Sequence, residues 1–163
     1  MEARINQANQ GQLTHSLEIR GIPVKTGETP EGIICSIGAA LGVKLGPEDL
    51  DAVERKRPRG EDPRPPAIVV RFVRQTVCDQ VIRLRKVKRN FTTRHLGWDS
   101  DERIYTGEEM TPANRHLYWL ARQVKAAGRL RYVWFARGRV RCRREDGQPV
   151  VIINTAEDLE AFH

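Results

Sequence analysis

Apolar and polar residues alternate along the first ordered stretch of the chain and then change to a helical period. Residues 17–24 place Leu17 and Ile19 on one side and charged residues on the other, and a glycine and a proline end the run. This pattern predicts a strand followed by a turn. Residues 30–43 carry isoleucine, alanine and leucine at helical spacing after a leading proline, which predicts a helix.

The same patterns continue to residue 98. Residues 50–57 and 67–73 predict two strands, residues 76–90 a helix, and residues 91–98 a last strand. The resulting order is β-α-β-β-α-β, the ferredoxin-like order that RNA-recognition-motif (RRM) domains share. The sequence therefore predicts an RRM-like α+β domain over residues 14–98.

A second, smaller α+β domain is predicted over residues 102–163. It begins with a short strand at residues 104–105, and a helix starts at the Thr111-Pro112 pair. The rest of the domain is predicted to be a hairpin over residues 130–143 with glycine in its turn, then another strand and a short last helix. Residues 1–13 are polar, and they are either a disordered tail or the end of a helix that continues upstream, such as a coiled coil.

The positive charge of the chain is concentrated in two blocks. The net charge is +7 and the pI is about 9.8. Residues 63–98 hold nine Lys and Arg against a single acid, and residues 129–144 hold seven Arg and no acid. Localised charge of this kind favours a surface for a polyanion such as nucleic acid, although a basic surface that serves only solubility is the alternative.

The hairpin carries the sharpest local signal. In its second strand Val140 and Cys142 alternate with arginines, so the arginines should share the opposite face. A row of like charges on one strand is costly without an anionic partner, and the arginine fork suits phosphate and base contacts. The alternative is a solvated face that discourages aggregation. The binding residues predicted here are Arg137, Arg139, Arg141 and Arg143.

A second group of cations follows the helix of residues 76–90. It exceeds what a helix C-terminus needs to balance its dipole, and the group consists of Lys86, Lys88, Arg89 and Arg94. The proline-rich loop before residue 67 could be an import-like signal, a flexible clamp on nucleic acid, or a solvated segment. It adds the candidate binding residues Arg55, Arg57 and Arg59, and isolated positions in the two domains add Arg71 and Arg115.

Other chemistry is not indicated. The aromatic residues Tyr118, Trp119, Tyr132, Trp134 and Phe135 could stack bases, but so small a domain should need most of them in its core. The three separated cysteines are expected in the core, and neither they nor the four scattered histidines have the spacing of metal ligands, so no metal site or cofactor is expected. No catalytic motif is present, so no enzyme is expected. No apolar run is long enough for a signal peptide or a membrane span, so we expect an intracellular protein, cytoplasmic or nuclear.

Several segments resemble a known family. LTHSLEIRGIP, KVKRNFTTRHLGW and, most specifically, the block from Ile104 to Asn154 are similar to the C-terminal region of the baculovirus few-polyhedra (FP) protein and its insect relatives. More distantly, the layout resembles the first-open-reading-frame RNA-binding proteins of LINE-type retrotransposons. The resemblance implies a nucleic-acid chaperone that grips RNA between an RRM and a C-terminal domain. It also implies a homo-oligomer formed through an upstream coiled coil.

An ordinary RRM stacks bases on aromatic residues of its central strands. Here those positions hold Glu18, Ala67 and Val69, so we expect affinity to come from the rim of this domain and from the second domain. The sequence predicts a module that binds and remodels single-stranded RNA or DNA and packages RNA into a ribonucleoprotein. The alternative is a protein-interaction module for viral or chromatin assembly whose basic face meets an acidic partner.

Overall fold

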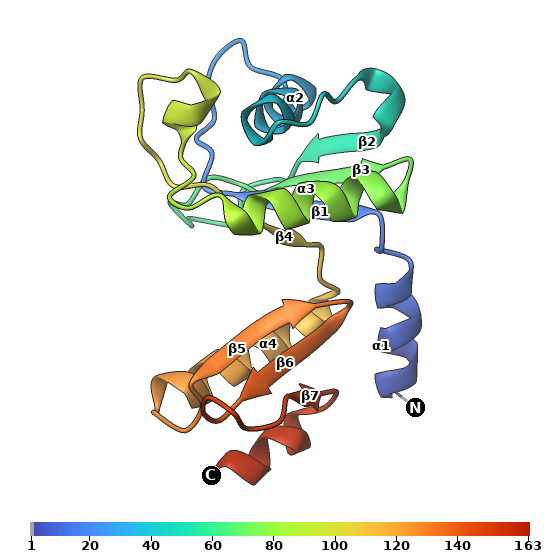
Figure 1. The fold of residues 1–163 in the computed structure, drawn as a ribbon, viewed down its shortest axis with the longest axis vertical. Coiled ribbons are helices and arrows are strands. Elements are labelled where there is room, and N and C mark those ends of the chain that lie inside the picture. The colour runs from blue at the N-terminus through green and yellow to red at the C-terminus, as the bar shows by residue number, and fades with distance from the viewer. Residues whose placement is uncertain (1) are drawn as a thin grey trace. The chain divides into compact units, whose positions relative to one another are not determined.

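The computed structural model describes residues 2–163 and divides into two compact units, each with its own antiparallel sheet (Figure 1). One unit comprises residues 15–109. The other, which we call the C-terminal unit, combines residues 2–14 with residues 110–163. The predicted α+β class is confirmed.

The unit of residues 15–109 contains a four-stranded sheet in the order β2-β3-β1-β4, and every neighbouring pair is antiparallel. Its elements are β1 (Ser16–Arg20), α2 (Pro30–Leu41), η1 (Pro47–Asp49), β2 (Leu50–Arg55), β3 (Ile68–Phe72), α3 (Gln75–Val87), η2 (Thr93–Leu96) and β4 (Tyr105–Glu108). The predicted strands at residues 17–24, 50–57 and 67–73 and both predicted helices are therefore confirmed.

Alternation along the strands builds the core of this unit. Leu17 and Ile19 of β1 are fully buried against Ile34 and Ile37 of α2 and Val81 of α3. The Thr29 hydroxyl caps α2 by accepting a hydrogen bond from the Gly32 backbone amide. Gly42, in the left-handed conformation, ends the helix. Burial of apolar area in this cluster is the main force that holds the two helices on one face of the sheet.

The predicted strand over residues 91–98 is wrong. Residue Thr92 forms only an isolated bridge with Arg103, and its hydroxyl then accepts a hydrogen bond from the Arg94 amide to start a short 3-10 helix. Gly97 ends that helix with a φ of 84°. A capping hydroxyl and a left-handed glycine turn the backbone away from an extended path. The fourth strand of the sheet is instead β4, which pairs with β1.

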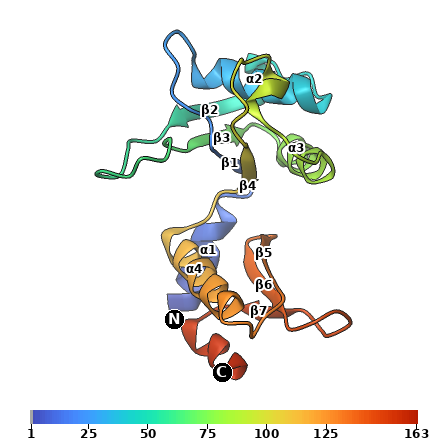
Figure 2. The same cartoon turned by 90° about the vertical axis from the view of Figure 1, so that its left-hand side faces the viewer.

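The other unit contains a three-stranded antiparallel sheet in the order β5-β6-β7. Its elements are α1 (Glu2–Gly11), α4 (Pro112–Ala126), β5 (Tyr132–Ala136), β6 (Arg139–Arg143), β7 (Val151–Ile153) and η3 (Ala156–Phe162). Figure 2 shows α4 covering one face of this sheet. Leu117 and Ala121 of α4 pack there with Val140, Cys142 and Ile153 of the sheet.

Residues 2–11 form the helix α1 and not a disordered tail. This helix packs against the start of α4, about 100 residues further along the chain. The side-chain oxygen Oε1 of Gln10 accepts hydrogen bonds from the Thr111 backbone amide and from the Asn114 side-chain amide, both at 2.9 Å. The side chain of Asn6 donates to Asn114 at 3.0 Å. These buried and half-buried side-chain amides surround the start of α4, where helix N–H groups lack partners within the helix. The side-chain network therefore fixes α1 on α4.

Cys78 and Cys142 are buried in the two cores, as predicted, and Cys35 is half-buried. Burial, helped by the nearby carboxylates of Asp79 and Glu108, raises the pKa of the Cys78 thiol to about 12. Within residues 2–163 no cluster of His, Cys, Asp and Glu could hold a metal ion. None of the helices in that range is both long and apolar enough to cross a membrane.

Candidate nucleic-acid interface

The hairpin of β5 and β6 sets the geometry of the strongest candidate site. Its loop has two residues, Arg137 with a φ of 53° and Gly138 with a φ of 72°. Two successive positive φ angles define the type I′ turn, whose twist matches that of the flanking strands. The turn pairs Ala136 with Arg139, so the register of the whole hairpin follows from it.

That register brings aromatic and cationic side chains to one face. Trp134 lies opposite Arg141 and Tyr132 lies opposite Arg143, and directly opposed residues project to the same side of a sheet. The other face of the hairpin, with Val140 and Cys142, packs into the core. We call the half-buried set on the side away from the core the arginine–aromatic face, and it consists of Tyr132, Trp134, Arg139, Arg141 and Arg143.

The expectation that most aromatic residues would lie in the core is wrong for this face. Tyr132 and Trp134 are half-buried and lie outside the core cluster, whereas Phe135 and Tyr118 pack against it. The signal that sequence reasoning missed was the hairpin register. A two-residue loop at Arg137-Gly138 already implies that the aromatic residues two and four positions before Ala136 face the arginine row.

Local hydrogen bonds hold two of the three arginines in place. Arg139 Nη1 donates to the Asn154 side-chain oxygen at 2.9 Å, and Arg141 Nε donates to the Ala136 carbonyl at 3.0 Å. A guanidinium has five N–H donors, so each of these side chains keeps donors for a ligand. The Nε of Arg143 is buried, and within residues 2–163 it has no hydrogen-bond partner. Side chains that are already oriented lose less entropy when they bind.

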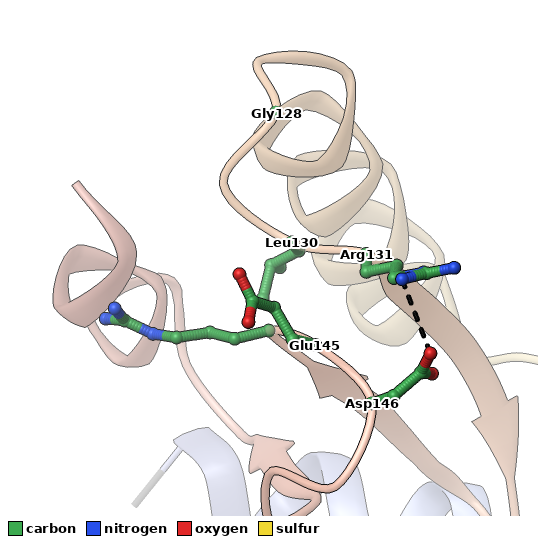
Figure 3. Close-up of a pocket in the computed structure, with 6 residues that line it drawn as sticks. Gly128, Leu130, Arg131, Glu145 and Asp146 are labelled. Atoms are coloured by element: carbon green, nitrogen blue, oxygen red, sulfur yellow. Dashed lines mark ion pairs between the residues drawn. The ribbon is translucent and has the colours of Figure 1, made fainter.

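A pocket of about 510 Å³ lies where the chain enters β5 and leaves β6 (Figure 3). Its lining mixes both signs of charge, and Arg131 pairs with Asp146 at 3.3 Å. The Tyr132 hydroxyl donates to the same carboxylate, a hydrogen bond that raises the pKa of Tyr132. Because carboxylates line it, the pocket attracts anions less than the arginine–aromatic face does. The lining residues are Gly128, Leu130, Arg131, Arg144, Glu145 and Asp146.

The predicted cations after α3 lie together at the end of that helix in the other unit. Lys86 and Arg89 are exposed, and the Lys88 ammonium lies 5.9 Å from the centre of the Phe91 ring. Arg85 has a structural role, because its guanidinium donates to the Lys88 carbonyl at 2.9 Å and to the Ile104 carbonyl at 2.7 Å. Desolvation lowers the pKa of Arg85.

The arginines around β2 and β3 have different environments. Arg55 donates to the carbonyls of Ile22, Pro66 and Pro23, so it joins three segments of the backbone. Desolvation lowers the pKa of Arg55. Arg57 and Arg59 are exposed in the loop after β2, whereas Arg71 is exposed on β3 opposite Ala52. Arg94 pairs with Asp101 at 3.3 Å on the surface.

The two remaining candidates belong to the C-terminal unit. Arg115 is half-buried on α4, and Arg137 is exposed at the hairpin turn. Two exposed aromatic residues were not predicted as site residues. Trp119 on α4 and Tyr105 on β4 are each 56% exposed. The helical wheel of α4 could have revealed Trp119, because it lies opposite the core residues Leu117 and Ala121.

Comparison with known proteins bears on the unit that carries the arginine–aromatic face. No curated protein sequence matches the chain. Residues 111–163 match the family model described as Baculovirus FP protein domain 2. The matched segment spans α4, all three strands of the sheet and η3. It confirms the resemblance to the few-polyhedra family that the block from Ile104 to Asn154 indicated. Over residues 111–163 the chain is therefore similar to baculovirus FP protein domain 2.

Proposed function

We propose that this protein binds single-stranded nucleic acid, most favourably RNA, through the arginine–aromatic face. The observation that carries the proposal is the hairpin register, which pairs Trp134 with Arg141 and Tyr132 with Arg143 across the strands. Aromatic rings can stack on bases, while neighbouring guanidinium groups contact phosphates or extend the stack. Packaging of RNA into a ribonucleoprotein, with chaperone activity, is the role that the few-polyhedra and retrotransposon resemblance suggests.

A single strand suits this face better than a duplex. Bases within a duplex are stacked on one another and hide their faces, whereas an unpaired strand can turn them toward a protein ring. Each stacked base contributes about 1–3 kcal/mol, and every base has a stacking face. Binding should therefore tolerate many sequences and depend on an unpaired strand.

The unit of residues 15–109 contributes a second basic surface in this proposal. Its sheet order, β2-β3-β1-β4 with two helices, supports an RRM-like, ferredoxin-like arrangement. The register places Glu18 beside Val69, so its central strands offer no aromatic ring for stacking. Its share of the affinity comes from the exposed cations Lys86 and Arg89 at the end of α3. Self-association through an upstream coiled coil rests on the family resemblance alone.

The decisive experiment measures fluorescence anisotropy of labelled single-stranded RNA, single-stranded DNA and duplex RNA with the protein and its Trp134 variants. We expect single strands to bind more tightly than the duplex. Trp134→Leu removes the ring and should weaken binding to single strands by about 1–3 kcal/mol, whereas Trp134→Phe keeps a stacking ring and should retain most of the affinity. Equal affinity of wild type and both variants would refute stacking on this face.

The rival function is docking of an acidic protein partner on the same face. Polyglutamate serves as the probe, because it has negative charge but no bases. Suppose that polyglutamate displaces the RNA at equal charge concentration, and that Trp134→Leu changes neither the affinity for RNA nor the affinity for polyglutamate. The basic face then recognises charge alone. That result would favour the protein-interaction module.

A further inference from the structure

The outer surface of α4 carries an aromatic and cationic group of its own. Trp119 is 56% exposed, and its ring lies nearly parallel to that of His116, with 15° between the planes and 6.1 Å between the ring centres. The 15 residues of α4 include no Asp or Glu. A solvated helix usually intersperses charges of both signs, so this composition favours an anionic ligand.

The neighbours of Trp119 complete the group. Residues three apart lie one turn away along a helix, so His116 and Arg122 flank Trp119 on its two sides. The Arg122 guanidinium carbon lies 5.8 Å from the centre of the Tyr118 ring. Aromatic rings and guanidinium planes are the surfaces on which unpaired bases stack. We call this group the α4 patch; it consists of the exposed residues His116, Trp119 and Arg122, and it is bordered by Tyr118, which also packs against the core.

The α4 patch and the arginine–aromatic face lie on opposite sides of the same unit. Leu117 and Ala121 of α4 pack against Val140 and Cys142, which project from the sheet on the side away from its arginines. Figure 2 shows α4 on one side of the sheet, so the sheet separates the outer surface of α4 from the arginine row. A short strand that lies on one surface cannot contact the other at the same time.

We propose that the α4 patch is a second binding surface for single-stranded nucleic acid, so that one C-terminal unit holds two strands, one on each side. This inference rests on the proposed function. A nucleic acid fits the patch better than a protein partner does. Protein interfaces are built around several apolar side chains that become buried together. In α4, all of which the structure describes, Trp119 is the single large apolar residue that is exposed. Holding two strands together raises their local concentration, which promotes annealing.

The test uses the full chain and two oligouridylates of about six nucleotides, too short to reach both surfaces. One carries a donor dye and the other an acceptor dye, and they cannot pair with each other. We expect energy transfer when both are mixed with the wild-type protein, and we expect Trp119→Ala to lower it, because the variant loses one of the surfaces that hold a strand. In a titration with one labelled strand, the same variant should bind one strand fewer per chain. Sedimentation at the same concentrations identifies any transfer that arises from protein dimers.

Two further variants keep the test specific. Gln123→Ala removes an uncharged side chain one turn from Trp119, and it should leave transfer and stoichiometry unchanged. Trp119→Phe retains a ring and should retain most of the transfer. Circular dichroism melting checks that each variant folds. We expect the Trp119 variants to fold, because this side chain is largely exposed and contributes little to the core.

The outcomes separate this inference from the proposed function. If no single strand binds the wild-type protein, the proposed function and the inference both fail. If strands bind and Trp134→Leu weakens them, but Trp119→Ala changes neither stoichiometry nor transfer, the inference alone is refuted. It is also refuted if an acidic peptide quenches Trp119 fluorescence while short RNA does not, because the patch would then bind protein.

Discussion

Replacement of Arg139, Arg141 and Arg143 by glutamine tests the electrostatic part of the proposed interface. These three side chains share the outer face of β6 and do not contribute to the core. Glutamine keeps a polar side chain of moderate length and removes the charge. The observed affinity for single strands falls with salt, and the slope of log K against log salt is about −0.7 for each phosphate contact.

If each arginine contacts one phosphate, the triple variant should have a slope less negative by about 2. At about 0.15 M salt the same counterion term corresponds to a loss of roughly 50-fold in affinity. The loss should shrink toward higher salt, because the variant releases fewer counterions.

The assay is a salt titration of fluorescence anisotropy with labelled single-stranded RNA. The matched control replaces the same three arginines by lysine, which preserves the charge and should preserve the slope while losing some stacking and fork geometry. Thermal melting monitors the loss of the Arg139–Asn154 hydrogen bond. An unchanged slope in the glutamine variant, with an unchanged fold, would show that these arginines do not contact phosphates.

Four further predictions concern the framework of the two units. Gln10→Ala should lower the free energy of unfolding by about 1–3 kcal/mol, measured by urea denaturation, because it leaves buried amides at the start of α4 without an acceptor; no change would mean that α1 is not docked in solution. Arg85→Ala should lower the free energy of unfolding by a similar amount without altering the slope of log K against log salt, because Arg85 holds two backbone carbonyls. Lys86→Ala should make that slope less negative by about 0.7 with little effect on stability. Identical behaviour of the two variants would contradict their assigned roles. Iodoacetamide near neutral pH should modify Cys35 well before Cys78, as mass spectrometry can show, since the thiol pKa of Cys78 is about 12. Because the unfolded thiol ionises first, with a pKa near 9.0, the contribution of Cys78 to stability should decline as pH rises from about 9 toward about 12; a steady contribution across that range would indicate that the thiol is solvated.

The sequence by itself determined the α+β class and most of the secondary structure. Period-two alternation and helical spacing are local properties, and they matched β1, β2, β3 and the hairpin as well as α2, α3 and α4. The alternation of Val140 and Cys142 with arginines also predicted which face of β6 is cationic. Local periodicity was sufficient here because each element buries one side and exposes the other.

Only the tertiary structure decided which of the predicted side chains are available to a ligand. Arg55 was predicted as a binding cation, but the backbone carbonyls of Ile22, Pro66 and Pro23 accept hydrogen bonds from its guanidinium. Residues 91–98 have a strand-like composition, yet the hydroxyl of Thr92 and the left-handed Gly97 turn the chain into a short helix. Such partners are close in space but are not specified by the local pattern of residues.

The largest difference between sequence and structure concerns segments that are distant along the chain. The N-terminal helix joins the C-terminal unit through Asn6 and Asn114, which are 108 positions apart, and no periodic pattern encodes such a contact. The arginine–aromatic face likewise needs two strands in one register before Trp134 meets Arg141. Sequence periodicity specifies which side of an element is apolar. The pairing of elements depends on turns and long-range packing, and it decides which of the remaining side chains lie together on one surface.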